Sequence, residues 1–216
     1  MGFGFLFLGS FFRFDFPFHG LDIFPDAVGF ALMLLGIFTL CDYEKKFVKA
    51  KYAGFAALMA SLGELVTQLI AFLGEPTSDW LSLSVTLLVG ITSALFDVFL
   101  LLAIASLAHE VGVEKIRRKA YRNLILVLLV FLPEFVFSLG IPALSSLAET
   151  LNRRVFFTNV LFCLDVFVRL LNLILILSCY MRICREGDED MGMEKPSLSS
   201  VLPQKSEKAK KKKNKK

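Results

Sequence analysis

Residues 81–107 read LSLSVTLLVGITSALFDVFLLLAIASL, and Asp97 is the one charged residue among them. A helix needs about 20 mostly apolar residues to cross the hydrocarbon layer of a bilayer, which is roughly 30 Å thick. This stretch is longer than that requirement, so it predicts a membrane-crossing helix with some tilt. The remaining apolar stretches of the chain are interpreted around this helix.

The chain as a whole is too apolar for an ordinary soluble domain. Hydrophobic residues make up 56% of the 216 residues, and the mean hydropathy is +0.65, whereas a soluble domain is about 45–50% apolar. The excess is concentrated in blocks, with no loop between them long enough to fold alone. The sequence therefore predicts an all-α, polytopic transmembrane helix bundle with five to six membrane segments, at about 3–18, 24–41, 53–73, 81–107, 124–144 and 155–183.

The segment 24–41 is short, but its start is well marked. Asp22 is placed to cap the helix N-terminus, Pro25 suits the first turn, and Asp26 lies where the helix dipole favours an acid. Its 18 residues reach roughly 27 Å at 1.5 Å per residue, which is just sufficient to cross.

The segment 3–18 leaves the number of crossing helices open. Its apolar part, residues 2–12, is too short to cross as a helix, and a longer helix would include Arg13, Asp15 and Pro17. One interpretation is a short crossing helix whose Arg13 reaches back to the membrane surface. The other is a re-entrant or interfacial segment. Phenylalanine at every second position up to 18 favours an extended or interfacial connection there.

Lysine and arginine are concentrated in alternate loops. Residues 42–52 contain four of them and residues 108–123 contain five, whereas residues 74–80 contain none. The positive-inside rule therefore places the two basic loops in the cytoplasm and Trp80 at the outer interface. The predicted location is a cell membrane, crossed several times, with the C-terminus in the cytoplasm.

Residues 185–216 contain acidic residues, then a Ser/Pro stretch, then eight lysines. With almost nothing apolar to bury, we expect a disordered, lysine-rich cytoplasmic tail. Two roles stay open for it: a solvated tail that fixes topology, or one that binds anionic inner-leaflet lipids at around 1 kcal/mol per charge. Besides the lipid bilayer, a second copy or another membrane protein is a candidate partner, and no nucleic acid is expected.

Charged residues also lie near the centres of the predicted crossing helices. Such residues cost roughly 2.5–3.5 kcal/mol each on insertion scales, so they should face the protein interior and be paired. The five are Glu64, Asp97, Glu134, Asp165 and Arg169. Polar or small neighbours recur with them at spacings of three, four or seven, which is typical of an inward-facing stripe. The stripes are Ala57, Ser61, Glu64 and Gln68; Thr86, Gly90, Ser93 and Asp97; and Thr158, Phe162, Asp165, Arg169 and Asn172.

Four acids against one arginine leave an excess of three negative charges if all are ionised, so protons or cations must compensate them. One interpretation is a helix-packing or assembly component, in which Asp165 pairs with Arg169 while the other three acids stay neutral and hydrogen-bond across helices. The alternative is a proton- or cation-coupled transporter or permease, in which the acids form an intramembrane pathway.

Motifs of common enzymes and cofactor sites do not occur in the sequence. There is no H-E-x-x-H, no G-x-S-x-G and no phosphate-binding glycine loop. The two histidines and four cysteines do not show zinc-ligand spacing. We therefore expect neither an enzyme nor a bound cofactor or metal.

Residues 21–36 read LDIFPDAVGFALMLLG. They contain the motif D-x-x-P-D-x-x-G-aromatic, carried by Asp22, Pro25, Asp26, Gly29 and Phe30. With the Phe-rich stretch before it, this segment resembles a group of small uncharacterised multi-pass membrane proteins of Gram-positive bacteria. The resemblance covers about the first 40 residues. It implies a bacterial plasma membrane and supplies no catalytic residues.

Overall fold

The computed structural model describes residues 2–14, 17–18, 21–22, 26–73, 78–138 and 153–184. Over these residues the chain is an all-α helical bundle with one small hairpin, so the all-α helix bundle predicted from the sequence is confirmed. Its elements are α1 (Gly2–Phe12), β1 (Pro17–Phe18), β2 (Leu21–Asp22), α2 (Asp26–Leu40), α3 (Phe47–Phe72), α4 (Asp79–Glu110), α5 (Glu114–Ser138), α7 (Arg153–Cys179) and the π-helical turn η1 (Tyr180–Cys184).

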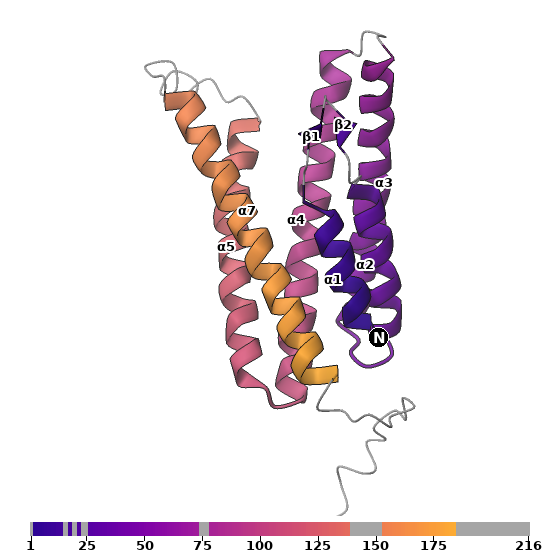
Figure 1. Ribbon diagram of the computed structural model, residues 1–216, viewed down its shortest axis with the longest axis vertical. Helices are drawn as coiled ribbons and strands as arrows, with labels where there is room; N and C mark the ends of the chain where they lie inside the picture. The colour runs from indigo at the N-terminus through magenta and orange to yellow at the C-terminus, as the bar shows by residue number, and fades with distance from the viewer. Residues whose placement is uncertain are drawn as a thin grey trace, which may run out of the picture.

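The described helices form a closed ring. Each packs against the next one along the chain, and α7 returns to pack against α1. In Figure 1, α3, α4, α5 and α7 run along the length of the molecule, whereas α1 and α2 lie beside the lower parts of α3 and α4. The upper ends of α5 and α7 lean away from α3 and α4. The turns at 41–46 and 111–113 and the end of η1 lie at the lower end, which we call the basic end.

Glycines bring the backbones of α1 and α2 into close contact. Gly2 and Gly9 are seven residues apart on α1, and Gly29 and Gly36 are seven apart on α2, so each pair lies on one helix face. A Cβ atom at Gly36 would lie 2.5 Å from the backbone oxygen of Gly2, and one at Gly29 would lie 2.9 Å from that of Gly9. Small residues permit such approach between helices. The close packing of α1 against α2 therefore explains why the motif has a glycine at position 29.

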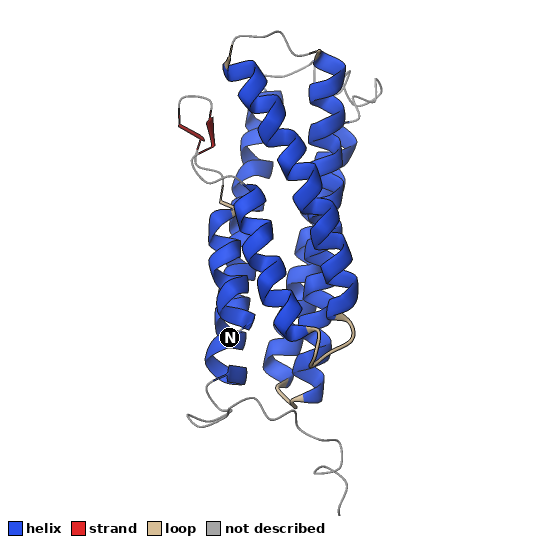
Figure 2. Cartoon of the chain, turned by 90° about the vertical axis from the view of Figure 1, so that its right-hand side faces the viewer, coloured by secondary structure: helices blue, strands red, loops and turns tan. Residues whose placement is uncertain are grey.

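The N-terminal segment is not one continuous helix over 3–18. α1 has 11 residues, roughly 17 Å at 1.5 Å per residue, which is about half the hydrocarbon thickness of a bilayer. The backbone is extended at Pro17 and Phe18, which pair antiparallel with β2. The extended connection predicted from the alternating phenylalanines is confirmed at β1, one of the two strands in Figure 2. It is wrong at Phe12, which is the last residue of α1. The predicted N-cap role of Asp22 is wrong, because Asp22 lies in β2 and α2 begins at Asp26.

The four longer helices occupy the stretches predicted for them, but all begin earlier: α4 and α7 by two residues, α3 by six and α5 by ten. α3 begins at Phe47 and α5 at Glu114, so each includes lysines or arginines that were predicted to lie in a loop. These residues are good helix formers, so the helices extend beyond their apolar parts. The predicted end of the 124–144 segment, Pro25 and the whole tail, 185–216, lie outside the described residues.

Three described helical segments are long and apolar enough to cross a membrane: Phe47–Phe72, Trp80–Glu110 and Asn159–Arg182. α1 and α2 are apolar but shorter. Large apolar side chains such as Phe72, Leu129 and Ile125 are more than half exposed on the outside of the ring. An apolar outer surface of this kind is compatible with a membrane protein.

Candidate functional site

The centre of the ring contains a buried arginine that follows the last residue of α1. Arg13 is 7% exposed and donates two hydrogen bonds to Asp97 of α4, Nη1 to Oδ1 at 2.6 Å and Nη2 to Oδ2 at 3.0 Å. Its Nη2 also donates to the hydroxyl of Ser93 at 2.7 Å. Two parallel bonds between a guanidinium and a carboxylate form a strong and directional pair. Asp97 is therefore paired with Arg13, a partner that neither interpretation of the sequence had assigned to it.

The surroundings of Arg13 explain how a charged side chain is held at this position. Its guanidinium carbon lies 4.6 Å from the ring centre of Phe30 and 5.7 Å from that of Phe96. The two rings meet edge to face at 5.4 Å, and ring faces attract a desolvated cation. At Gly29 a Cβ atom would lie 2.8 Å from the Cγ of Arg13. The motif pair Gly29 and Phe30 therefore shapes the space that Arg13 fills.

A second ion pair lies on α7 and is connected to the first. Arg169 Nε donates to Asp165 Oδ2 at 2.6 Å, one helical turn away, as the packing interpretation predicted. Arg169 Nη1 also donates to the backbone oxygen of Arg13. This bond joins α7 to the end of α1 and helps to close the ring.

One amide pair links α5 to α7 below these ion pairs. Asn123 is fully buried, and its Nδ2 donates to Oδ1 of Asn172 at 3.1 Å. A buried amide without such a bond would cost about 1–3 kcal/mol. Asn172 had been predicted to face inward, whereas Asn123 had been predicted to be the last residue of the basic loop 108–123.

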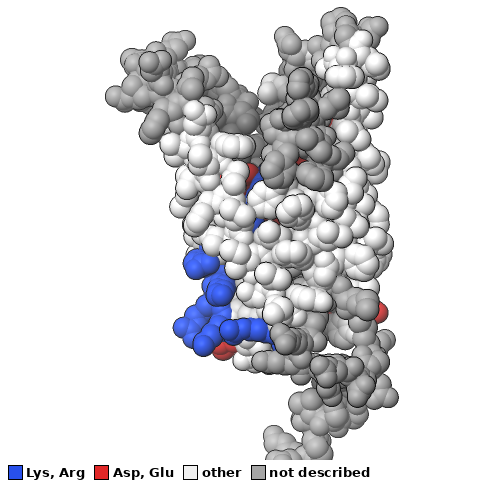
Figure 3. Space-filling view, in the orientation of Figure 1, with Lys and Arg blue, Asp and Glu red and all other residues white. Residues whose placement is uncertain are grey.

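A cavity of about 300 Å³ lies above the ion pairs, on the side away from the basic end. The cavity is lined mainly by the first half of α4 and the second half of the described part of α5. Because these two helices run in opposite directions, both halves lie away from the basic end. Figure 3 shows acidic and basic atoms between the two upper lobes of the molecule. The charged lining residues are Arg13, Asp26, Glu64, Asp97, Asp165 and Arg169, with Thr86, Gly90, Ser93 and Asn172 among the others.

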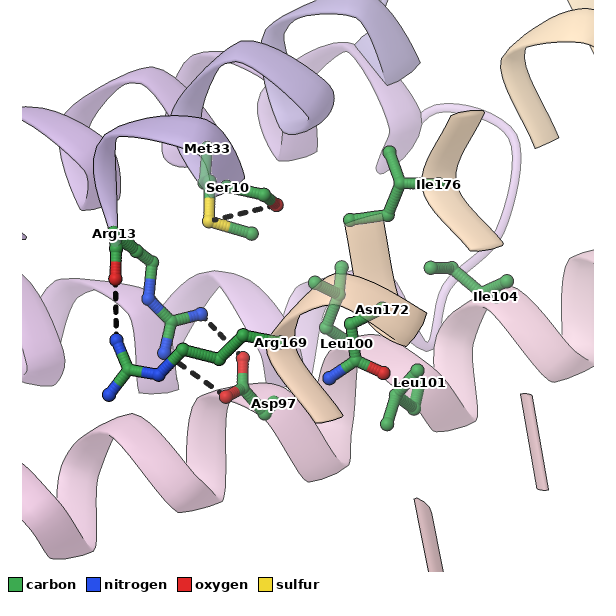
Figure 4. A pocket seen from close by; sticks show the side chains of 10 residues that line it. All are labelled: Ser10, Arg13, Met33, Asp97, Leu100, Leu101, Ile104, Arg169, Asn172 and Ile176. Carbon is green, nitrogen blue, oxygen red and sulfur yellow. Dashed lines mark hydrogen bonds and ion pairs between the residues drawn. The ribbon is translucent and has the colours of Figure 1, made fainter. Parts of the chain in front are cut away.

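A much smaller pocket, of about 20 Å³, lies on the other side of the ion pairs (Figure 4). Leu101, Ile104 and Ile176 line it, and these residues come from the halves of α4 and α7 nearer the basic end. This volume is sufficient for one water molecule. Four residues line both spaces, namely Arg13, Asp97, Arg169 and Asn172. They form a layer between the cavity and the pocket, which we call the charged layer.

The structure brings together most of the charged cluster predicted from the sequence. Glu64, Asp97, Asp165 and Arg169 line the same cavity. The side chain of Glu134 lies outside the described residues. The predicted charge count is wrong because Arg13 supplies a second buried positive charge. One of the two interpretations of residues 3–18 had Arg13 reaching back to the membrane surface, whereas the structure buries it against Asp97.

The predicted polar stripes are right in full on one helix and in part on the other two. On α4 the whole stripe lines the cavity. On α3, Ala57 and Ser61 are buried and Glu64 lines the cavity, whereas Gln68 is half-buried and is not among the lining residues. On α7, Phe162 is 58% exposed and does not face inward. The side chain of Thr158 lies outside the described residues. A phenylalanine fits the outer apolar surface as well as the interior, so its spacing alone could not decide which way its side chain faces.

Within the described ranges, no group of three or more His, Cys, Asp or Glu side chains is arranged to hold a metal ion. Two of the four carboxyl groups that line the cavity, those of Asp97 and Asp165, are paired with arginine side chains. The chemistry available there is electrostatic binding and proton exchange.

Comparison with known proteins assigns no function to this site. No protein family matches the chain, and no curated protein or solved structure matches it either. The resemblance of residues 21–36 to small membrane proteins of Gram-positive bacteria therefore stays a prediction.

Proposed function

We propose that this protein crosses a cell membrane several times and carries a small polar solute through the ring. The observation that supports this function best is the cavity of about 300 Å³ whose described lining includes two arginines and four carboxylic acids. Ionisable groups inside a membrane are costly and are usually kept for substrate or ion pathways. A ring of helices around a charged central cavity is a suitable architecture for a carrier.

In this proposal α3, α4, α5 and α7 cross the bilayer, and α1 and α2 form a re-entrant pair that enters from the cytoplasmic side. α2 has 15 residues, roughly 22 Å at 1.5 Å per residue, so it ends short of the far surface of a layer of about 30 Å. Irregular backbone at such depth is tolerated where protein or a water-filled cavity surrounds it. The re-entrant pair would deliver Arg13 to the middle of the membrane, opposite Asp97.

The orientation follows from the position of the basic residues. Figure 3 shows lysines and arginines gathered at the basic end, and the positive-inside rule assigns that end to the cytoplasm. The cavity then opens toward the outside, and the charged layer separates it from the cytoplasm. Single cysteines at positions 80 and 119 test this topology in intact cells with an impermeant thiol reagent. We expect labelling at 80 and protection at 119, and the reverse pattern would refute the assignment.

Coupling to protons or cations follows from the charge balance of the described lining. Four carboxyl groups and two guanidinium groups leave two negative charges if all are ionised. Like-charge proximity and desolvation then favour binding of a proton or a cation. A carrier can use such binding to drive its solute, provided that the charged layer opens on one side at a time.

Proteoliposomes with an imposed pH gradient test the coupling. We expect wild-type vesicles to dissipate the gradient faster than empty vesicles when a transported solute is present. Glu64→Gln should slow dissipation because it removes a carboxyl group from the cavity. Glu114→Gln is the matched control, since Glu114 is exposed at the start of α5. Equal rates for wild type, Glu64→Gln and empty vesicles over a panel of solutes would reject proton coupling.

A second candidate function, a helix-packing or assembly component, is favoured by the two complete ion pairs. Arg13 with Asp97, and Arg169 with Asp165, already hold α1, α4 and α7 together without any solute. Its partner would be a second copy or another membrane protein, with the lysine-rich tail on anionic lipids. In this case the cavity variant Glu64→Gln should leave the phenotype unchanged, and crosslinking in the membrane should capture a partner.

A further inference from the structure

The two sides of α1 are packed very differently. On one side the backbones of α1 and α2 touch, because a Cβ atom at Gly9 would lie 2.6 Å from the backbone oxygen of Gly29. On the other side α1 meets α7 and η1, where a Cβ atom at Gly4 would lie 3.8 Å from the ring of Tyr180. Among the described helix pairs that form the ring, α1 and α2 share the most extensive contact and α1 and α7 the least. The contact between α1 and α7, which we call the seam, can therefore open with the least loss of packing.

A charged hydrogen bond crosses the seam. Arg169 Nη1 of α7 donates to the backbone oxygen of Arg13, and backbone oxygens at a helix end have no partner inside their own helix. The negative end of the α1 dipole also favours a nearby cation. Asp165 accepts a hydrogen bond from Nε of the same guanidinium at 2.6 Å, so it orients the rigid fork that points Nη1 across the seam. Release of this bond frees α1 from α7 and leaves the Arg13–Asp97 pair in place.

The seam also closes the small pocket below the charged layer. Ile176 of α7 is 2% exposed and lines that pocket together with Ser10, which comes from α1 (Figure 4). The pocket has room for about one water molecule, so a solute in the cavity cannot reach the basic end in this state. Because α1 and α7 each supply part of the pocket wall, their separation would join the pocket to the basic end.

We propose that the seam is the cytoplasmic gate of this protein and that the hydrogen bond from Arg169 to the Arg13 backbone is its latch. The gate rests on the proposed carrier function, in which the basic end faces the cytoplasm. When the latch opens, α7 moves away from α1, while α1, α2 and α4 stay together through the glycine contacts and the Arg13–Asp97 pair. A carrier needs such a gate because its central site opens to one side at a time. Asp165 is a positioning residue, since it acts through Arg169.

The accessibility of a cysteine in the pocket tests the latch in the full-length protein in detergent. The four native cysteines are replaced by alanine, and Ile176→Cys is then labelled with a small thiol reagent. We expect slow labelling while the latch is intact. Labelling should be about tenfold faster or more in Arg169→Met/Asp165→Asn, because a hydrogen bond to a charged group contributes at least that factor. The double variant removes both charges, so it leaves no carboxylate without its arginine.

Ile37→Cys is the matched control. Ile37 is also fully buried, but it lies on α2 and is not among the residues that line the pocket. Its labelling rate should be the same with and without the latch, because α1 and α2 stay together. Equal acceleration at both positions would indicate a general loosening of the bundle and overturn the latch, and so would an unchanged rate at position 176.

The single variant Asp165→Asn tests the positioning role. Asp165 does not line the small pocket, so its substitution cannot admit the reagent merely by making space there. Asparagine keeps an acceptor for Arg169 Nε but not the charge, so labelling at position 176 should be intermediate between the intact protein and the double variant. A rate equal to that of the intact protein would overturn the role assigned to Asp165.

A crosslink across the seam tests the gate and separates it from the carrier function. Gly4→Cys and Tyr180→Cys, joined by a short bifunctional maleimide, should stop dissipation of the pH gradient in proteoliposomes. The same pair treated with a monofunctional maleimide should remain active. Full dissipation after crosslinking would overturn the gate and leave the carrier function standing. If untreated vesicles dissipate the gradient with no solute in the panel, the carrier function is wrong and the gate with it, while the labelling rates still decide whether the latch holds the seam.

Discussion

The close contact between α1 and α2 makes a quantitative prediction about alanine at Gly36. A Cβ atom there would lie 2.5 Å from the backbone oxygen of Gly2 and 3.0 Å from the backbone nitrogen of Leu6. Favourable contacts between heavy atoms lie at about 3.5–4.0 Å, so the backbones must separate by roughly 1 Å. Overpacking of this kind costs about 1–3 kcal/mol. Alanine also favours the helix over glycine by about 0.5–1 kcal/mol, which offsets part of the cost.

Gly63→Ala is the matched control, because its Cβ atom would meet nothing within 4 Å. It gains the same helix preference without the overpacking, so the preference cancels when the two variants are compared. The difference in unfolding free energy should therefore be about 1–3 kcal/mol, with Gly36→Ala the less stable variant. For a chain of this size 1 kcal/mol corresponds to about 2–4 °C, so the midpoints should differ by about 2–12 °C.

Thermal unfolding in detergent, followed by circular dichroism, measures this difference directly. Gly36→Ala should also weaken protection of the α1 backbone amides against hydrogen exchange, because it separates α1 from α2. A Gly36→Ala midpoint equal to or above that of Gly63→Ala would refute the close helix contact. Gly2→Ala should then be equally harmless, since a Cβ atom at Gly2 meets Thr39 and Gly36 from the opposite side.

Three further predictions concern polar groups. Asp97→Ala should cost about 3–5 kcal/mol in a denaturant titration because it leaves a buried guanidinium unpaired, whereas adding Arg13→Met to it should recover most of that loss. Asn123→Ala should cost about 1–3 kcal/mol in the same titration, and no measurable loss would contradict the buried amide pair. The hydrogen bond from Arg117 lowers the pKa of Glu114 below its ordinary 4.5, so this pair stabilises the fold above that pH and the contribution is lost as the pH falls through the lowered value. The gap in unfolding temperature between wild type and Glu114→Gln should accordingly close between pH 7 and pH 3, and a gap that is unchanged at pH 3 would refute the pair.

The helices could be predicted from the sequence because long apolar stretches allow few other structures. The inward position of Asp97 followed from the cost of an isolated charge among apolar residues, and the Asp165–Arg169 pair followed from helical spacing. Both depend on local rules that need no knowledge of the neighbouring helix.

The role of Arg13 could not be predicted from such rules. Its partner is 84 residues away, and an arginine at the end of a short apolar stretch is usually interpreted as a surface anchor. The glycine spacing gives a signal: Gly2 and Gly9 are seven residues apart, as are Gly29 and Gly36, and two such pairs predict a tight helix pair. Such a pair would have placed residue 13 beside residue 29, inside the bundle.

The separation of Arg13 from Asp97 in the chain has a consequence for synthesis. At about 5–20 residues per second, the 84 residues between them take roughly 4–17 s to emerge. Arg169, which bonds to the backbone of Arg13, lies 156 residues away and emerges later still. During this interval a guanidinium without its carboxylate favours water. In the proposed membrane arrangement, α1 and α2 should therefore wait at the membrane surface and enter the ring after α4 has been inserted. The N-terminal residues, although made first, would then be among the last to take their final position.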